Sequence, residues 1–346
     1  MSTKKRIEWV DVVKGMAVPL IILGHTAQSP AIIAYVYSFH MPLFFLLSGY
    51  TSRRAADWKT YGKHILKDFC YLILPCILVQ LGIETVELWM KVGHIEFLSW
   101  AKITGVFYRL FWGCAWGWAS GFPTIGMLWF FFTMFWAKVI WEGIGLLFPK
   151  KDIAMCIFVS LIGIWIGLDH YIPQNLDIAM MVVLYYCIGH LVRKYQEEEL
   201  FQKLKMPVFW AALCFWVFCA QQGIYIELAI ESYPGIVTAI LESMCGSYVF
   251  CILAQEVTEN QICKKIFTFL GRHTLLIVLV HHADSLLESI WMQDNWVMST
   301  VYRGVVVLGI SVGVIALRCA VKKLFFVLQS SKKRRNKNGG IEKFYR

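Results

Sequence analysis

The sequence predicts an all-α polytopic membrane protein with about ten transmembrane helices and both termini in the cytoplasm. Two observations favour this fold class. Of the 346 residues, 58% are hydrophobic and only 16% are charged, whereas soluble domains carry about 25% charged residues. Apolar segments of about 20 residues, the length that crosses a bilayer as a helix, also recur from end to end. Together they exclude a soluble globular protein.

Each apolar segment predicts one helix, in chain order. The first segment contains Asp11 and Lys14 and lacks a small-residue cleavage site, so it predicts a retained helix and not a signal peptide. The stretch 91–124 is rich in Gly and Trp and too interrupted for a span, which favours an outer interfacial or re-entrant segment. The predicted helices span residues 9–29, 36–50, 68–90, 125–146, 153–168, 177–192, 206–222, 235–254, 265–283 and 298–328.

The basic residues predict the orientation. Most of the 33 Lys and Arg residues fall in segments that this arrangement places on the side of the N-terminus, which the positive-inside rule makes cytoplasmic. Residues 1–328 form the predicted membrane domain, and residues 329–346 form a basic cytoplasmic tail. The formal charge of +10 does not indicate a nucleic-acid partner, because the basic residues form short clusters between apolar spans. The basic residues predicted outside are Lys91, Lys102, Arg109 and Arg303.

No metal site or disulfide framework is predicted. The eleven cysteines nearly all lie inside apolar runs without a CxxC pair, so they are interpreted as packing residues. His281 and His282 are adjacent, and a regular helix cannot point both into one metal site.

Ionisable residues inside predicted spans are candidates for function, because the bilayer makes them costly. Lys14 and His25 lie eleven residues apart on the first helix, close to three turns, so they share one face about 16 Å apart along the axis. That face connects the cytoplasmic side to the outer half. The alternatives are an interfacial ion pair between Asp11 and Lys14 and a hydrogen-bonded helix contact for His25.

Three histidines are predicted at one depth in the outer half. His25 ends the first helix, His40 begins the second after a short connection, and His281 lies near the outer end of the ninth. A neutral imidazole can take a proton from a hydroxyl or attack an activated acyl group, so acyl transfer fits this set. The alternative is three unrelated interfacial histidines, and His282 could face inward in place of His281.

Two glutamates are further candidates. Glu242 lies in the apolar run AILESMCGSYVF, and Glu84 lies on the outer part of the third helix. Either carboxylate could hydrogen-bond a sugar hydroxyl, and either could equally be a buried tether.

Six sequence motifs resemble those of the integral-membrane acyltransferase type 3 family, in the family's order. The first, RIEWVDVVKGMAVPLIILGH, contains the hallmark pair of a basic residue and a histidine, here Lys14 and His25. The others are SFHMPLFFLLSGY, KHILKDFCYLILP, MLWFFFTMFW around Trp129, YYCIGHLVRK and GRHTLLIVLVHH. The family includes sugar and cell-envelope O-acetyltransferases.

The resemblance implies a ten-helix bundle in a cell membrane, expected to be the bacterial cytoplasmic membrane. Such a bundle takes an acyl group, usually from acetyl-CoA, at the cytoplasmic face and delivers it to a hydroxyl of a glycan or envelope precursor; acyl-CoA is a substrate and not a resident cofactor. It implies that His25 is the acid/base or acyl relay. The family more often has arginine at the position of Lys14. A lysine can still bind phosphate through its charge, but it cannot form the two parallel hydrogen bonds of an arginine.

The two substrates of such an enzyme are expected to bind at the candidate residues named above and at basic residues of the inner face. The expected donor site comprises Lys14, Asp11, Lys63 and Lys67, because CoA phosphates need cations on the inner face. Trp129, Glu84 and Glu242 are the expected acceptor contacts.

A second function stays open at this stage. The same kind of domain resembles the membrane portion of vancomycin-resistance serine racemases, so a carrier for a small substrate such as L-serine is the alternative. A racemase domain would follow the last helix there, whereas this sequence stops at Arg346, which favours the acyltransferase.

Overall fold

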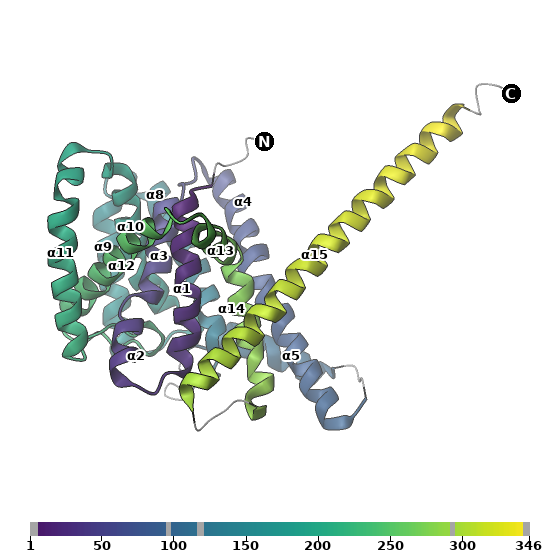
Figure 1. The fold of residues 1–346 in the computed structure, drawn as a ribbon, viewed down its shortest axis with the longest axis horizontal. Helices are drawn as coiled ribbons and strands as arrows, with labels where there is room; N and C mark the ends of the chain where they lie inside the picture. The colour runs from purple at the N-terminus through teal and green to yellow at the C-terminus, as the bar shows by residue number, and fades with distance from the viewer. Residues whose placement is uncertain (1–5, 95–97, 116–120, 291–294, 342–346) are drawn as a thin grey trace.

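The computed structural model describes residues 6–94, 98–115, 121–290 and 295–341. These residues form helices joined by turns and loops, with isolated β-bridges and no β-strand among them. The helices pack side by side in one bundle, and α15 leaves it as a long diagonal rod (Figure 1). The start of α1 and the far end of α15 lie at the same end of the bundle (Figure 1).

The bundle is built from long helices and shorter segments at their ends. The α-helices are α1 (Glu8–Thr26), α2 (Pro30–Tyr37), α3 (His40–Thr51), α4 (Trp58–Asp68), α5 (Leu74–Val92), α6 (Trp100–Trp112), α8 (Trp129–Leu147), α9 (Asp152–Gly167), α10 (Leu176–Tyr195), α11 (Glu199–Gln221), α12 (Val237–Val257), α13 (Gln261–Arg272), α14 (Thr274–Ala283) and α15 (Trp296–Ile341). The remaining segments are the π-turn η1 (Phe69–Ile73) and the 3₁₀ segments η2 (Gly126–Leu128), η3 (Pro173–Asn175), η4 (Leu228–Ile230) and η5 (Asp284–Ile290).

All ten predicted segments are helical, but fewer than ten qualify as full spans. Within the described residues, eight helices are long and apolar enough to cross a membrane, and a bent pair makes up to nine. The exception is α9, whose 16 residues reach only about 24 Å, less than the roughly 30 Å hydrocarbon core. The bent pair is α13 and α14, which meet at an angle of 65°. The predicted boundary at 328/329 falls inside α15, which continues to Ile341.

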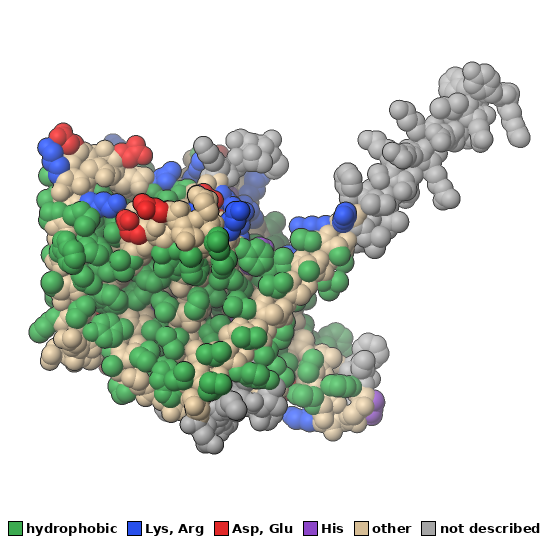
Figure 2. All heavy atoms as spheres, in the orientation of Figure 1, with side chains coloured by type: hydrophobic (Ala, Val, Ile, Leu, Met, Phe, Trp, Pro, Cys, Tyr) green, Lys and Arg blue, Asp and Glu red, His purple; other side chains and the backbone are tan. Residues whose placement is uncertain are grey.

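The side-chain distribution matches a protein that crosses a bilayer. Figure 2 shows a broad belt of hydrophobic side chains around the bundle, with most of the visible Lys, Arg, Asp and Glu residues near the end where α1 starts. The predicted interfacial stretch contains α6, which buries Val106 and Leu110 and exposes Trp100 and Tyr108. The structure therefore supports an all-α, multi-pass membrane protein.

Glycines set the closest helix contacts. A Cβ on Gly15 of α1 would collide with the backbone carbonyl of Phe267, and a Cβ on Gly271 of α13 would collide with that of Asp11. Small residues let helix backbones approach closely in membranes. This close contact brings the first turns of α1 against the end of α13.

A second glycine pair joins α3 to α10. A Cβ on Gly49 would strike the backbone of Tyr186, and a Cβ on Gly189 would strike the backbone of Leu46. The sequence pattern SGY is also typical of a helix end, and α3 does end two residues later at Thr51. The structure adds a packing reason for glycine at this position.

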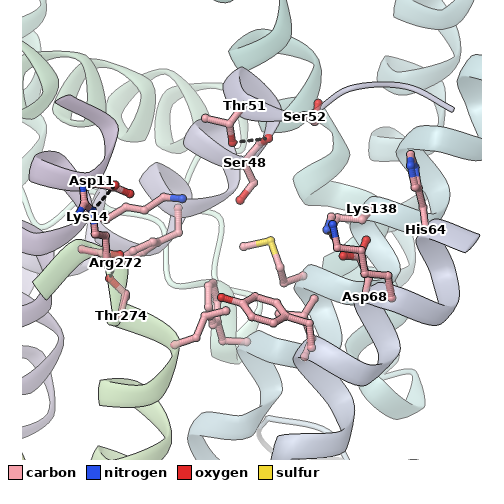
Figure 3. Close-up of a pocket in the computed structure, with 18 of the residues that line it drawn as sticks. Asp11, Lys14, Ser48, Thr51, Ser52, His64, Asp68, Lys138, Arg272 and Thr274 are labelled. Atoms are coloured by element: carbon pink, nitrogen blue, oxygen red, sulfur yellow. Dashed lines mark hydrogen bonds and ion pairs between the residues drawn. The ribbon is translucent and has the colours of Figure 1, made fainter. Parts of the chain in front are cut away.

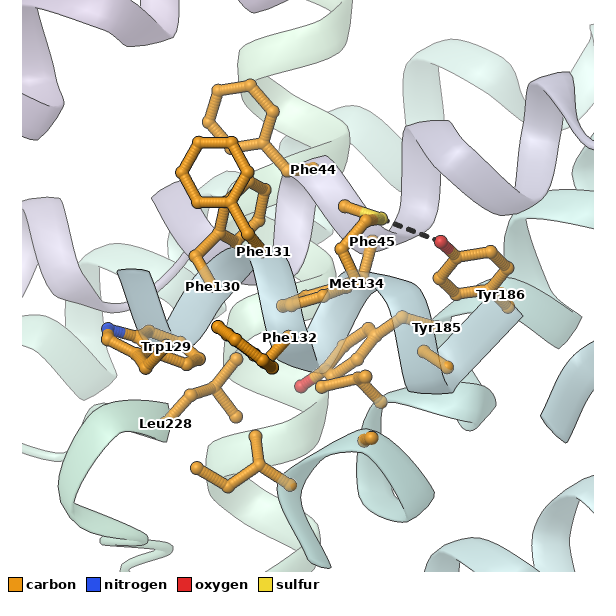
Figure 4. Close-up of a cluster of buried hydrophobic side chains, with 14 of the residues drawn as sticks. Phe44, Phe45, Trp129, Phe130, Phe131, Phe132, Met134, Tyr185, Tyr186 and Leu228 are labelled. Atoms are coloured by element: carbon orange, nitrogen blue, oxygen red, sulfur yellow. Dashed lines mark hydrogen bonds between the residues drawn. The ribbon is translucent and has the colours of Figure 1, made fainter. Parts of the chain in front are cut away.

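Aromatic side chains fill the centre of the bundle. Phe130, Phe131 and Phe132 of α8 pack among α3 and α10 side chains, including Phe45 and Tyr186 (Figure 4). The Tyr186 hydroxyl donates a hydrogen bond to Met134 Sδ at 2.7 Å. In a bilayer, dispersion contacts and interhelical hydrogen bonds hold helices together, because lipid tails are as apolar as the core. This core holds the cavity walls described next in place.

Candidate active site

The inner cavity opens near the end of the bundle where α1 starts. It has a volume of about 430 Å³ and is lined by residues of α1, α3, α4, α8, α13 and α14. Lys14 and Lys138 extend from opposite walls (Figure 3). The basic lining residues are Arg6, Lys14, Arg53, Lys67, Lys138 and Arg272, and the acidic ones are Asp11, Asp68 and Glu142.

The carboxylates of the inner cavity each have a basic partner. Arg272 Nε lies 3.3 Å from Asp11 Oδ2, and His64 Nδ1 lies 2.7 Å from Glu142 Oε2. Asp68 pairs with Lys138. Basic side chains still outnumber acidic ones in the lining, so the cavity suits a ligand with several negative charges. Asp11, which the sequence predicts at the donor site, lines this cavity as the ion-pair partner of Arg272.

The outer cavity lies toward the other end of α1. Its volume is about 450 Å³, and it is lined by His25, His40, His282, Trp129 and Glu227, together with mostly apolar side chains. Glu227 belongs to the loop between α11 and α12, outside the spans, and burial raises the pKa of its carboxyl. The cavity thus combines imidazoles with an apolar wall, which is typical of small-ligand sites.

His40 is held in one tautomer. Its Nδ1 lies 2.7 Å from the carbonyl oxygen of Val36. A carbonyl oxygen only accepts, so Nδ1 donates, and Nε2 of the neutral ring carries no proton. The ring also packs edge to face on Tyr37, with centroids 5.1 Å apart. His40 can therefore offer a basic nitrogen to the outer cavity.

The predicted third histidine lies behind the first. The rings of His25 and His281 have centroids 5.4 Å apart, but His281 is only 1% exposed and is not among the lining residues of the outer cavity. The neighbouring His282 lines the cavity instead, with Nε2 3.2 Å from Gln80 Oε1. The prediction that both could not face one cavity is consistent with this arrangement.

Sequence reasoning missed Asp284, which binds His281, and Arg303, which binds Asp284. Asp284 Oδ2 accepts a hydrogen bond from His281 Nδ1 at 2.8 Å. Arg303 of α15 donates to both oxygens of Asp284, at 2.7 and 3.1 Å. The i,i+3 spacing of His281 and Asp284 was a usable signal, whereas the approach of Arg303 depends on the path of α15.

The other predicted site residues divide between the cavities and the rest of the bundle. Lys67 lines the inner cavity, but its neighbour Lys63 is exposed and is not among the lining residues. Glu84 lies 3.4 Å from Arg109 Nη1 and lines neither cavity. Glu242 is buried on α12 and is not among the lining residues of either cavity.

The two cavities share part of their walls. Phe44, Phe130 and Thr274 line both of them. Phe44 and Phe130 are each 4% exposed and Thr274 is 5% exposed. These three residues, called the septum below, separate a basic inner cavity from an imidazole-lined outer cavity.

Comparison with known proteins places the chain in a family. Residues 7–318 match the model of a protein family that is described as "Acyltransferase domain". Nodulation protein NolL of Sinorhizobium fredii is 23% identical, with 79% of this chain and 76% of that protein covered. Nodulation protein NolL of Mesorhizobium japonicum is also 23% identical, with 91% and 87% covered. No solved structure matches the chain.

Proposed function

Because this chain belongs to the acyltransferase family and is a multi-pass membrane acyltransferase, we propose that it is an O-acyltransferase that uses cytoplasmic acyl-CoA. The acceptor is a hydroxyl of a glycan or a cell-envelope precursor. One observation carries the proposal: the basic cavity and the imidazole-lined cavity meet at the septum of Phe44, Phe130 and Thr274.

The inner cavity is the proposed donor site, and acetyl-CoA is the proposed donor. The CoA phosphates would contact Lys14, Lys67 and Arg53, which belong to the six Lys and Arg residues that line this cavity together with three carboxylates. The pantetheine arm would extend toward the septum, carrying the thioester to the edge of the outer cavity. The positive-inside orientation, with this cavity facing the cytoplasm of a bacterial cell, supports the same assignment.

The outer cavity is the proposed acceptor site, with His25 as general base. As the hydroxyl oxygen attacks the thioester carbonyl, His25 takes the hydroxyl proton. The carbon–sulfur bond then breaks, and the protonated His25 returns the proton to the CoA thiolate. The products are an ester and free CoA. Trp129 at the cavity wall offers a flat apolar face for a sugar ring, and His40 offers a second nitrogen for its hydroxyls.

The test replaces His25 by alanine. Sealed vesicles with the inner face outward receive labelled acetyl-CoA and a mixture of envelope glycans, and label in the glycans is measured. A general base typically contributes about 10²–10⁴-fold, so His25→Ala should retain less than about a tenth of the turnover. His170→Ala, which changes an exposed loop histidine, is the matched control. Equal turnover in the two variants, or turnover with acetyl-CoA supplied only at the outer face, contradicts the proposal.

A further inference from the structure

A group of three side chains lies behind the outer cavity. Asp284 begins η5, directly after α14, and its side chain is 1% exposed. Arg303 approaches it from α15 and binds both carboxylate oxygens. His281 binds the same carboxylate from α14. The group therefore joins three elements, and none of its members is among the described lining residues of either cavity.

The hydrogen bonds of this group define the tautomer of His281. A carboxylate only accepts, so Nδ1 of His281 carries the proton that the 2.8 Å bond to Asp284 needs. In the neutral ring, Nε2 is then an unprotonated acceptor. Arg303 binds both oxygens of the Asp284 carboxylate, and this two-point contact restricts its rotation.

The second ring nitrogen of His281 has no hydrogen-bond partner among the described residues, and the ring of His25 packs beside that of His281. This nitrogen, Nε2, is buried. A buried acceptor without a donor destabilises the folded state. The ring of His281 packs against the ring of His25, with centroids 5.4 Å apart and planes tilted by 60°. His25 itself is exposed and lines the outer cavity.

We propose that His281, held by Asp284 and Arg303, is the positioning partner of His25. In this arrangement a ring N–H of His25 donates to Nε2 of His281, and the opposite nitrogen of His25 is left unprotonated toward the outer cavity. A small rotation of the exposed His25 ring completes the contact. The sequence-based assignment of His281 as a catalytic residue becomes a supporting role, because His281 acts through His25.

The inference deepens the proposed function, since it explains what makes His25 a base, but it can be tested without acyl-CoA or an acceptor. Diethyl pyrocarbonate transfers an ethoxycarbonyl group to an unprotonated imidazole nitrogen and releases ethanol and carbon dioxide. The purified full chain is treated with this probe, and peptide mass spectrometry measures the initial modification rate of each histidine. Exposed His170 is the internal reference, so the readout is the ratio of His25 to His170.

Four variants test the inference. Asp284→Asn should lower the His25 to His170 ratio at least fivefold, because an amide does not enforce the His281 tautomer. Asp284→Glu, which keeps the carboxylate, should restore at least half of the wild-type ratio. His281→Leu removes the acceptor while leaving Asp284 and Arg303 together, so it should match Asp284→Asn. Asp152→Asn breaks another aspartate–arginine pair, with Arg54 at 2.9 Å, and should leave the ratio unchanged.

The outcomes separate the inference from general loss of structure. Each variant is compared with wild type by thermal unfolding, and the His281→Leu variant decides if Asp284→Asn fails to fold. An unchanged ratio in the folded Asp284→Asn or His281→Leu variant overturns the inference. Equal ratios for Asp284→Asn and Asp284→Glu also overturn it. Failure of the proposed function alone would abolish glycan labelling in wild type but leave these ratios as expected.

Discussion

Phe44 of α3 and Phe130 of α8 pack edge to face, with ring centroids 5.8 Å apart, where the inner and outer cavities meet. Thr274 completes this septum at the bend between α13 and α14. In the proposed mechanism, an acyl group that moves from one cavity to the other passes these side chains. We therefore expect the septum to limit the size of the group that can be transferred.

Removing one ring of the septum should widen the donor specificity. Phe44→Ala should raise the ratio of kcat/KM for butyryl-CoA over acetyl-CoA by at least about tenfold, since each of the two added methylenes in an apolar pocket is worth about 1–3 kcal/mol. Phe45→Ala is the matched control, because Phe45 also packs on Phe130, at 5.5 Å, but lines neither cavity. Steady-state transfer with both donors measures the ratios. A similar rise in the Phe45→Ala variant would exclude a sieving role for the septum.

Lys63 and Lys67 of α4 should differ in donor binding. Lys67→Gln should raise the KM for acyl-CoA about tenfold, which corresponds to about 1.4 kcal/mol and is within the range of a charge-assisted phosphate contact. Lys63→Gln should leave the KM unchanged, because Lys63 is not among the cavity-lining residues. The difference should shrink at high ionic strength as salt screens the phosphates. Equal effects of both substitutions would move the donor site out of the inner cavity.

The close contact of α1 with α13 should tolerate no added methyl group. Gly271→Ala places a Cβ against the Asp11 carbonyl, and such overpacking typically costs about 1–3 kcal/mol. We expect the thermal midpoint in detergent to fall by several degrees. Gly82→Ala on α5 is the control, because nothing lies within 4 Å of its Cβ and alanine favours a helix by about 1 kcal/mol over glycine. A Gly271→Ala variant with an unchanged thermal midpoint would mean that α1 and α13 can move apart without loss of stability.

Stability should fall as the pH rises, because of Glu231. This residue lies in the loop before α12, outside the spans, and burial followed by the nearby Asp177 charge raises the pKa of its carboxyl to about 9. In the unfolded chain the carboxyl ionises near its ordinary pKa of 4.5, so the folded state holds a proton that the unfolded state loses. The stability that Glu231 contributes is therefore fully present below pH 4.5 and declines as the pH rises from there toward about 9.

Glu231→Gln should remove this pH dependence. The variant should unfold at a higher temperature than wild type at pH 8 and at a similar temperature at pH 4. Each pKa unit corresponds to about 1.4 kcal/mol. We therefore expect the free energy of unfolding of the variant at pH 8 to exceed that of wild type by more than about 2 kcal/mol. Thermal unfolding of both proteins between pH 4 and pH 9 measures it, and parallel curves for the two would contradict the assignment.

Local sequence determined the helices, because the bilayer requires long apolar segments whose backbone groups bond within each helix. The ten predicted segments all appear as helices, although α9 is too short for a full span. The spacing of Lys14 and His25 on α1 predicted residues at two depths, and they line two different cavities. Such spacing follows from the helix repeat alone, so it needs no knowledge of neighbouring helices.

Tertiary packing decided which side chains meet. Glu84 and Glu242 were candidates because ionisable side chains are costly within a bilayer, and neither is among the lining residues of the two described cavities. His281 came to lie behind His25, and Arg303 reached Asp284, because α14 bends from α13 and α15 crosses the bundle beside α14. Helix rotation, bend and crossing arise from contacts between residues far apart in the chain, which local periodicity does not encode.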